Sequence, residues 1–482
     1  MTSARTIQTI VNEQHAGTST ACDEVERSLQ HIDRVNADVQ AFREVYADEA
    51  RQAAERIDAD RAAGHSPGAL AGVPIAIKDN IVSRHGTSTA SSRMLEGYVS
   101  PFDATVVQRL EAAGAIIIGR THCDEFAMGS SGEHGAFGRA RNPWNTEHVP
   151  GGSSSGSAAA VASGCVSAAL GSDTGGSIRQ PAAFCGIVGF KPSYGRVSRS
   201  GLVAFGSSLD QIGPMTASVD DAAQLYAVIA GVDPDDATTA AHDVEDVTSA
   251  ATLPTQLRVG MSSAHLDAIT DNDVRRTVDA ARDRMAEAGA SFVDVTLPPP
   301  DISIATYYLI ATAEASSNLA RYDGIRYGRR AALTDDASLE ALYAASRSEG
   351  FGDEVRRRIL VGTFVLSAGY ADQYYGKALK ARRWIAACYE RAFSSCDVIL
   401  GPTTPTPAFR FGERPDPVEM YQCDVFTVDA NIAGLCAMSV PMGVHENANL
   451  PVGVQLTAAP FAEPTLFAAA RVLTANEPVS LP

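Results

Sequence analysis

The residues of this sequence that could perform chemistry are concentrated in two clusters of glycine and serine and in one lysine. The clusters span residues 151–157 (GGSSSGS) and 171–177 (GSDTGGS), and Lys78 directly follows the apolar run VPIAI at 73–77. Glycine allows the backbone to approach a ligand closely, and serine supplies a nucleophilic hydroxyl. We therefore expect the two clusters to form loops that converge on a small reactive volume.

Several familiar sites do not fit these residues. The segment 152–156 matches G-x-S-x-G, but a nucleophile elbow follows a β-strand, and the preceding RNPWNTEHVP is polar and contains proline. A P-loop is excluded because Gly156 is followed by Ser157 instead of a lysine. The ten histidines form no H-E-x-x-H motif, so no catalytic metal is expected.

A serine nucleophile needs a base and donors for the oxyanion. Lys78 is a candidate base, because an amine at the end of an apolar strand is desolvated and its pKa falls. A lysine that reaches solvent or pairs with Asp79 remains an alternative on local sequence. Ser177, after two glycines, is the candidate nucleophile, and the alternative is a cap for a helix at IRQPA. The first cluster would supply a second serine that carries the proton between them.

The elements that must position these residues point to an α/β fold. The apolar run 158–170, which joins the clusters, predicts a tightly packed buried helix, since a flexible linker would not continue into GIVGFKP. Helices are predicted over 20–37 and 46–63, and helix alternates with strand over 104–119 and 273–295. This alternation predicts a central mixed sheet covered by helices on both faces.

We predict one large domain over 1–482, because no internal repeat or linker divides the chain. Its parts are N-terminal helices (1–65), a catalytic core (66–230), an acidic surface loop (231–256), the rest of the core (257–300 and 397–482) and a helical insertion on the substrate side (301–396).

Composition restricts the partners and the compartment. The net charge of −18 argues against a broad nucleic-acid-binding surface, so another chain should hold any RNA, and the acidic excess would suit a high-salt cytoplasm. The eight cysteines are scattered without a C-x-x-C pair, which indicates reduced thiols. No signal peptide and no apolar run of membrane-spanning length is found, so we expect a cytoplasmic protein without a membrane contact.

Lys78, the two clusters and the stretches GIVGFKPSYGRVSRSGLVAF and SSLDQIGP resemble the amidase signature family. Its members hydrolyse amides with a Ser-cisSer-Lys triad. The resemblance implies that Ser177 is the nucleophile, that Ser153 is the bridging serine after a cis peptide bond, and that Lys78 is the base. It assigns the oxyanion hole to the backbone of Thr174, Gly175, Gly176 and Ser177. Ser155 departs from the family, which usually has glycine there.

Residues 307–328, 351–378, 398–409 and 420–441 are similar to the A subunits of tRNA-dependent amidotransferases, which are carbon–nitrogen ligases with glutamine as amido donor. The resemblance implies a heterotrimer in which this chain hydrolyses glutamine. The ammonia would pass to a B subunit that uses ATP and Mg²⁺ to amidate Glu-tRNA(Gln), Asp-tRNA(Asn) or both, and a C subunit would brace the assembly. It implies no cofactor in this chain and a tRNA held mainly by the B subunit.

Three further positions match the glutamine-holding residues of these subunits: Tyr308, Arg357 and Asp424. Arg357 can fork onto the α-carboxylate of glutamine, and Asp424 can pair with its α-amino group. Surface ion pairs and a core tyrosine are the alternatives. Two other functions stay open at this point: a stand-alone amidase for small or aryl amides, which needs neither charge, and a non-catalytic scaffold, against which the intact Lys78, Ser153 and Ser177 argue.

Overall fold

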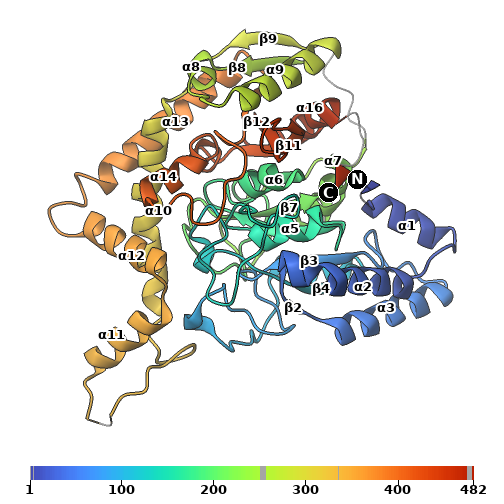
Figure 1. The fold of residues 1–482 in the computed structure, drawn as a ribbon, viewed down its shortest axis with the longest axis horizontal. Coiled ribbons are helices and arrows are strands. Elements are labelled where there is room, and N and C mark those ends of the chain that lie inside the picture. Colours follow the sequence, from blue (N-terminus) through green and yellow to red (C-terminus); the bar gives the residue numbers. More distant parts are fainter. Residues whose placement is uncertain (1, 4, 250–256, 335, 475–479, 482) are drawn as a thin grey trace.

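A mixed sheet of eleven strands forms the centre of the molecule (Figure 1). The computed structural model describes residues 2–3, 5–249, 257–334, 336–474 and 480–481. The strand order is β2-β4-β3-β5-β7-β6-β11-β12-β10-β8-β9, with β4–β3, β3–β5, β10–β8 and β8–β9 parallel and the other neighbours antiparallel. The strands are β2 Phe42–Val45, β3 Pro74–Lys78, β4 Ile116–Thr121, β5 Ala168–Asp173, β6 Val188–Lys191, β7 Gln211–Thr216, β8 Arg258–Met261, β9 Ser291–Asp294, β10 Val398–Pro402, β11 Cys436–Val444 and β12 Pro451–Ala458. Outside this sheet, β1 (Thr2–Ser3) pairs with β13 (Ser480–Leu481).

Helices cover both faces of the sheet, as the alternating pattern predicts. Successive strand residues point to opposite faces. In β3, Ala76 therefore joins the core under α2, α3, α5 and α6, while Ile75 and Ile77 join the core under α1, α4 and α7. The helices are α1 Ile7–His15, α2 Ala21–Val39, α3 Ala47–Ala62, α4 Thr105–Ala112, α5 Ser155–Ala162, α6 Arg179–Cys185, α7 Val219–Ile229, α8 Ser263–Asp267, α9 Asn272–Glu287, α14 Pro417–Tyr421, α15 Val428–Ile432 and α16 Glu463–Thr474.

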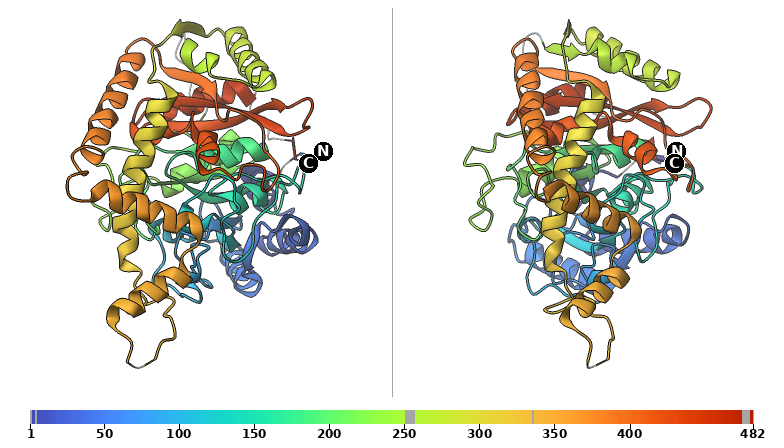
Figure 2. Two further views of the ribbon diagram at one scale, coloured as in Figure 1. Left: turned by 60° about the vertical axis from the view of Figure 1, so that its left-hand side comes forward. Right: turned by 90° about the vertical axis from the view of Figure 1, so that its left-hand side faces the viewer.

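A group of four longer helices lies along one side of the molecule, where Figures 1 and 2 both show α10 crossed by α12. The four are α10 Pro300–Asn318, α11 Leu339–Gly350, α12 Asp353–Leu366 and α13 Tyr375–Phe393. Helix α10 packs against α12 and α13, and its buried face joins the core with Phe126 and Phe205. Apart from Pro300, the first residue of α10, these helices fall within the segment 301–396, for which the sequence predicts a helical insertion.

The prediction of one buried helix over 158–170 is wrong. Helix α5 ends at Ala162, the chain turns at Ser163 and Gly164, and residues 168–173 form the central strand β5. A run of alanine and valine carries no amphipathic period, so the pairing of β5 with β3 and β7 decides its conformation. The second glycine-serine cluster consequently begins inside a strand.

Other local predictions agree with the structure. The helices predicted over 20–37 and 46–63 are α2 and α3, whereas the sequence pattern does not predict the short helix α1 or the edge strand β2. All eight cysteines are free thiols. Residues 231–249 contain no helix or strand, and 250–256 of the predicted acidic loop lie outside the described residues. None of the helices in the described ranges is long and apolar enough to cross a membrane.

Candidate active site

Lys78 is the last residue of β3 and is fully buried. Its Nζ lies 2.7 Å from Ser153 Oγ, 2.9 Å from Ser172 Oγ and 3.3 Å from the Ser172 carbonyl oxygen. Burial, partly opposed by nearby acidic groups, lowers the pKa of Lys78 to about 8. Lys78 therefore neither reaches solvent nor pairs with Asp79, whose carboxylate instead pairs with Arg43.

Ser172 fixes the orientation of the lysine nitrogen. A neutral amine has two N–H groups and one lone pair, and the hydroxyl and carbonyl oxygens of Ser172 can accept both N–H groups. The lone pair then faces Ser153 Oγ, which is the direction a proton acceptor needs. Asn80 Nδ2 donates to the same Ser172 hydroxyl at 2.9 Å and holds it in place. Sequence reasoning does not single out Ser172 or Asn80, because only the strand geometry shows which serine of the cluster faces Lys78.

The loop of Ser153 is fixed from several sides. Its peptide bond to Gly152 is cis, as the resemblance implies. The Ser153 carbonyl accepts a hydrogen bond from the Asp124 N–H (3.2 Å), and the Gly152 N–H donates to Gln180 Oε1 (2.9 Å). A Cβ at residue 152 would clash with Asp124 Oδ2, so only glycine fits there. The Ser154 N–H donates to the Ser177 carbonyl (3.1 Å), which brings the two clusters together as expected.

The loop of Ser177 follows β5 and is held by a buried ion pair. The Gly176 N–H donates to Asp173 Oδ1 (2.8 Å), and Arg179 forks onto both oxygens of Asp173 at 3.0 Å. Burial alone would raise the pKa of Asp173, but the charges of Arg179 and Lys191 and the hydrogen bonds from Arg179 and Asn431 together outweigh it and bring the pKa to about 2. Helix α6 starts at Arg179 without a side-chain cap, so Ser177 does not act as a helix cap.

The backbone of residues 174–176 is held between Tyr307 on α10 and Thr427. Thr427 Oγ1 donates to the Gly175 carbonyl at 2.6 Å, and a Cβ on Gly175 would come within 2.5 Å of the Tyr307 ring. Gly176 has φ +137°, a region that favours glycine, and a Cβ there would meet Thr427. Because the Gly176 N–H is bound to Asp173, it does not point at a ligand, which leaves the N–H groups of Thr174, Gly175 and Ser177 as the candidate oxyanion donors.

Asp424 is buried beside this loop. Ser130 Oγ donates to its Oδ2 at 2.5 Å, while its Oδ1 is buried without a hydrogen-bond partner among the described residues. That Oδ1 lies 3.3 Å from the position a Cβ would take on Gly176. Burial raises the pKa of Asp424 to about 7. An unsatisfied buried carboxylate of this kind is suited to a cationic ligand group.

Tyr308 belongs to a cluster of aromatic rings around a buried arginine. Its ring stacks on Tyr421 with centroids 3.9 Å apart, and the Arg358 guanidinium lies 5.3 Å from the centroid of each ring. Arg358 Nε and the Tyr421 hydroxyl both donate to Glu354 Oε1, at 2.8 and 2.9 Å. Burial holds the pKa of Tyr308 well above its ordinary value. Tyr308 is thus a packed, uncharged residue.

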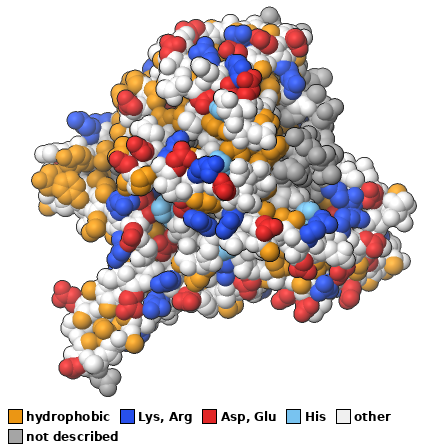
Figure 3. All heavy atoms as spheres, in the orientation of Figure 1, with side chains coloured by type: hydrophobic (Ala, Val, Ile, Leu, Met, Phe, Trp, Pro, Cys, Tyr) orange, Lys and Arg blue, Asp and Glu red, His pale blue; other side chains and the backbone are white. Residues whose placement is uncertain are grey.

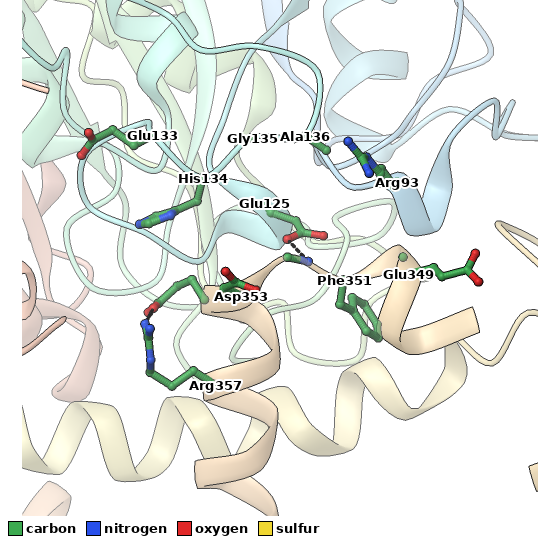
Figure 4. A pocket seen from close by; sticks show the side chains of 13 residues that line it. Arg93, Glu125, Glu133, His134, Gly135, Ala136, Glu349, Phe351, Asp353 and Arg357 are labelled. Atoms are coloured by element: carbon green, nitrogen blue, oxygen red, sulfur yellow. Dashed lines mark hydrogen bonds and ion pairs between the residues drawn. The ribbon is translucent and has the colours of Figure 1, made fainter. Parts of the chain in front are cut away.

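Arg357 lies on another side of α12 and lines a cavity of about 530 Å³ (Figure 4). Its half-exposed side chain forms an ion pair with Glu354. Glu125 faces the same cavity and accepts a 2.8 Å hydrogen bond from the N–H of Gly352, the residue that precedes α12. No hydrogen bond or ion pair joins Arg357 to Tyr308 or Asp424 within the described residues, so the three predicted substrate residues do not touch one another here.

One group of possible metal ligands occurs among the described residues, away from these loops: Asp271, Asp273 and His445. Asp271 caps the start of α9 and its Oδ2 lies 3.3 Å from His445 Nε2, while the Glu446 N–H donates to Asp273 Oδ2 at 2.8 Å. These bonds tie the β11–β12 turn to α9, which explains the cluster without a metal.

Comparison with known proteins agrees with this geometry. The amidase family model matches residues 23–467. The A subunit of glutamyl-tRNA(Gln) amidotransferase from Anaeromyxobacter sp. (strain K) is 52% identical over 451 residues, which cover 93% of this chain and 91% of that protein. The crystal structure of the corresponding Thermotoga maritima protein is 43% identical, with a TM-score of 0.79 over 95% of this chain and 92% of that one. The peptide amidase of Stenotrophomonas maltophilia is 30% identical, with a TM-score of 0.82 over 98% and 96% of the two chains. The chain therefore belongs to the amidase family and is similar over nearly its whole length to amidotransferase A subunits.

Proposed function

We propose that this chain is the glutaminase subunit of a tRNA-dependent amidotransferase. The observation that carries the proposal is the buried Asp424, whose Oδ1 lies beside Gly176 on the loop of Ser177 and has no hydrogen-bond partner among the described residues. A carboxylate at this place can bind the α-ammonium group of an amino acid whose side-chain amide reaches Ser177. A simple amide has no such cation, so Asp424 favours glutamine over small or aryl amides.

The hydrolysis follows from the order of the groups. Neutral Lys78 accepts the proton of Ser153 as Ser153 accepts that of Ser177, and Ser177 Oγ attacks the side-chain amide carbon. The N–H groups of Thr174, Gly175 and Ser177 stabilise the oxyanion. The proton returns through Ser153 to the leaving nitrogen, the C–N bond breaks and ammonia leaves. A water molecule then hydrolyses the glutamyl ester by the same relay.

Arg357 is the proposed partner of the α-carboxylate of glutamine. Its guanidinium faces the cavity and pairs with Glu354, which is also bound by Arg358 and Tyr421. Glu354 keeps these two partners when Arg357 turns to a substrate carboxylate, so the exchange leaves no buried acid unpaired. Tyr308, stacked on Tyr421, is the third residue proposed to contact glutamine.

The partners are inferred from the relatives. Their name describes one subunit of an enzyme that acts on glutamyl-tRNA(Gln). We infer that the ammonia passes to a B subunit, which uses ATP and Mg²⁺ to amidate Glu-tRNA(Gln), Asp-tRNA(Asn) or both, and that a C subunit braces the heterotrimer. The charge of −18 on this chain supports a division in which the B subunit holds the tRNA.

The decisive experiment measures ammonia release from glutamine by the purified chain, alone and with its B and C subunits. We expect release to rise sharply with the partners and to vanish in Ser177→Ala. The control substitution is Ser208→Ala, which removes the hydroxyl of a serine outside the triad. Release that survives in Ser177→Ala would refute the assignment of the nucleophile.

A stand-alone amidase remains the second candidate, because the peptide amidase structure superposes with a TM-score of 0.82. Propionamide and benzamide distinguish the two functions. Full activity of the isolated chain on these amides, with no preference for glutamine, would favour the general amidase.

A further inference from the structure

The second half of helix α12, residues 359–366, carries no charged side chain and is apolar on two opposite sides. Val355, Gly362 and Val365 are buried, and Gly362 touches the α10 backbone. On the outer side Leu360 is 70% exposed, and Val361 and Phe364 are also exposed. A helix that is apolar all round is normally buried all round. The outer face of α12 is therefore expected to be covered in the working protein.

The exposed apolar surface continues beyond the helix. We call the set of Leu360, Val361, Phe364, Leu366, Tyr370 and Tyr374 the α12 patch, and all six are exposed. The Phe364 ring lies 4.6 Å from that of Tyr370 and 5.9 Å from that of Tyr374, between centroids. Figure 3 shows hydrophobic side chains gathered at the left edge of the molecule, where Figure 1 places the chain between α12 and α13. Contiguous surfaces of this kind mark interaction sites.

Positive charge borders the α12 patch, although the chain carries a net charge of −18. The sequence contains four lysines, of which Lys78 and Lys191 are buried. The other two, Lys377 and Lys380, are exposed on α13 just after Tyr374. Arg356 is exposed on α12 but pairs with Asp353, and one acidic residue, Asp372, is exposed between Tyr370 and Tyr374. Both exposed lysines of the chain thus stand at one place, which indicates a partner surface that carries acidic residues around an apolar centre.

The α12 patch is connected to the candidate site through the helix itself. The first turn of α12 carries Glu354, the next turn carries Arg357 at the cavity, and Leu360 follows one turn later. Glu125 holds the start of the helix through the Gly352 N–H. A protein bound to the patch would lie beside the cavity and would contact the helix that positions Arg357.

We propose that the α12 patch is the docking surface for the B subunit, the proposed recipient of ammonia from the adjacent site, which would present apolar side chains rimmed by Asp and Glu. The proposal rests on the proposed function, which supplies the partner. Phe364, Tyr370 and Tyr374 could stack on bases, but RNA is the weaker occupant because the basic residues described at the border of the patch are only Lys377, Lys380 and the Asp353-paired Arg356, on a chain with a net charge of −18. A second copy is also disfavoured, since a two-fold contact through the same patch would bring its basic rim close to itself.

The test compares Leu360→Asp with Val232→Asp, a matched change at an exposed apolar residue outside the patch. The affinity of each purified chain for the purified B subunit is measured by calorimetry. We expect Leu360→Asp to weaken binding by about tenfold or more, as for a residue at the centre of an interface, and Val232→Asp to bind like the wild type. Folding is checked by an unchanged melting temperature and unchanged ammonia release by the isolated chain.

Lys377→Glu/Lys380→Glu should slow association and reduce its salt dependence. Equal affinities of Leu360→Asp and the wild type would overturn the proposal, as would a wild type that does not bind the B subunit. Two other results, each with an unchanged affinity for the partner, would also overturn the proposal. One is that Leu360→Asp abolishes self-association of the chain, and the other is that the double lysine variant, tested alone, no longer binds tRNA. If Leu360→Asp loses binding to the partner, and the wild type shows no glutaminase activity alone or in any assembly, the docking surface is upheld and the proposed function is refuted.

Discussion

Among single residues, the buried Lys78 determines how the proposed reaction depends on pH. Its pKa of about 8 means that the neutral amine, the form able to accept a proton, is lost as the pH falls. We expect kcat for glutamine to fall about tenfold per pH unit below 8 and to level off above it. Ammonia release at saturating glutamine, from pH 6 to 9.5, measures this. Lys78→Arg should be inactive at every pH, because a guanidinium stays charged; a flat wild-type profile would contradict the role of Lys78 as base.

Ser172 should act through Lys78 and not through the substrate. Ser172→Ala removes one of the two acceptors that orient the lysine nitrogen, so we expect kcat to fall about tenfold or more while KM stays unchanged. The midpoint of the pH profile should move to lower pH, since the charged amine loses an acceptor. Ser172→Thr, which keeps the hydroxyl, should restore both kcat and the midpoint of the pH profile to the wild-type values. A change in KM alone would show that Ser172 instead contacts the substrate.

Asp424 should make glutamine binding depend on pH separately from catalysis. Its pKa of about 7 lies above the ordinary carboxyl value, so the carboxylate is lost as the pH falls through 7. Because only the carboxylate pairs with the ammonium group, KM should rise by up to about tenfold per pH unit below 7. Asp424→Asn should raise KM and remove this dependence while leaving the kcat profile in place. A pH-independent wild-type KM would exclude Asp424 as the ammonium site.

Among the elements, α6, α15 and β12 are joined by the buried pair of Asp173 and Arg179. Arg179 also bonds to Asn431, Gln455 and the Thr427 carbonyl. Arg179→Met leaves Asp173 buried without its ion pair, and we expect the free energy of unfolding to fall by about 3–5 kcal/mol. Urea unfolding measures the change. Arg258→Met, which breaks the more exposed pair with Asp397, should cost no more than about 1 kcal/mol; equal losses would contradict this account.

Local patterns predict some elements well and others poorly. Helix α2 has a clear amphipathic period and a capping box at Thr20, so its pattern predicts it nearly to its ends. The pattern of strand β5 wrongly predicts a helix, because its alanines and glycine have no period of their own. Strand β2, four residues at the edge of the sheet, has too short a pattern to be recognised and is defined by its pairing with β4.

For the whole molecule, the net charge of −18 should make stability depend on salt. Repulsion among the excess acidic groups opposes the compact state, and salt screens it. We expect the melting temperature at pH 7.5 to rise between about 0.1 and 1 M NaCl. Near pH 5, which is the isoelectric point of the sequence, the rise should nearly disappear. An equal rise at both pH values would show that screening of the net charge is not its cause.

The type of fold, the two glycine-serine clusters and the candidates Lys78 and Ser177 could be predicted from local features of the amino-acid sequence, since hydrophobic period, glycine position and motif spacing are contained in neighbouring residues. The choice of Ser153 within the first cluster comes from the family resemblance. Tertiary packing determines which groups meet: Ser172 with Lys78, Asp124 with Gly152, and Asp424 with Gly176. Residues far apart in the chain come together only through sheet order and helix packing, and for that reason no local pattern could reveal that Arg358 is buried while Arg357 faces the cavity.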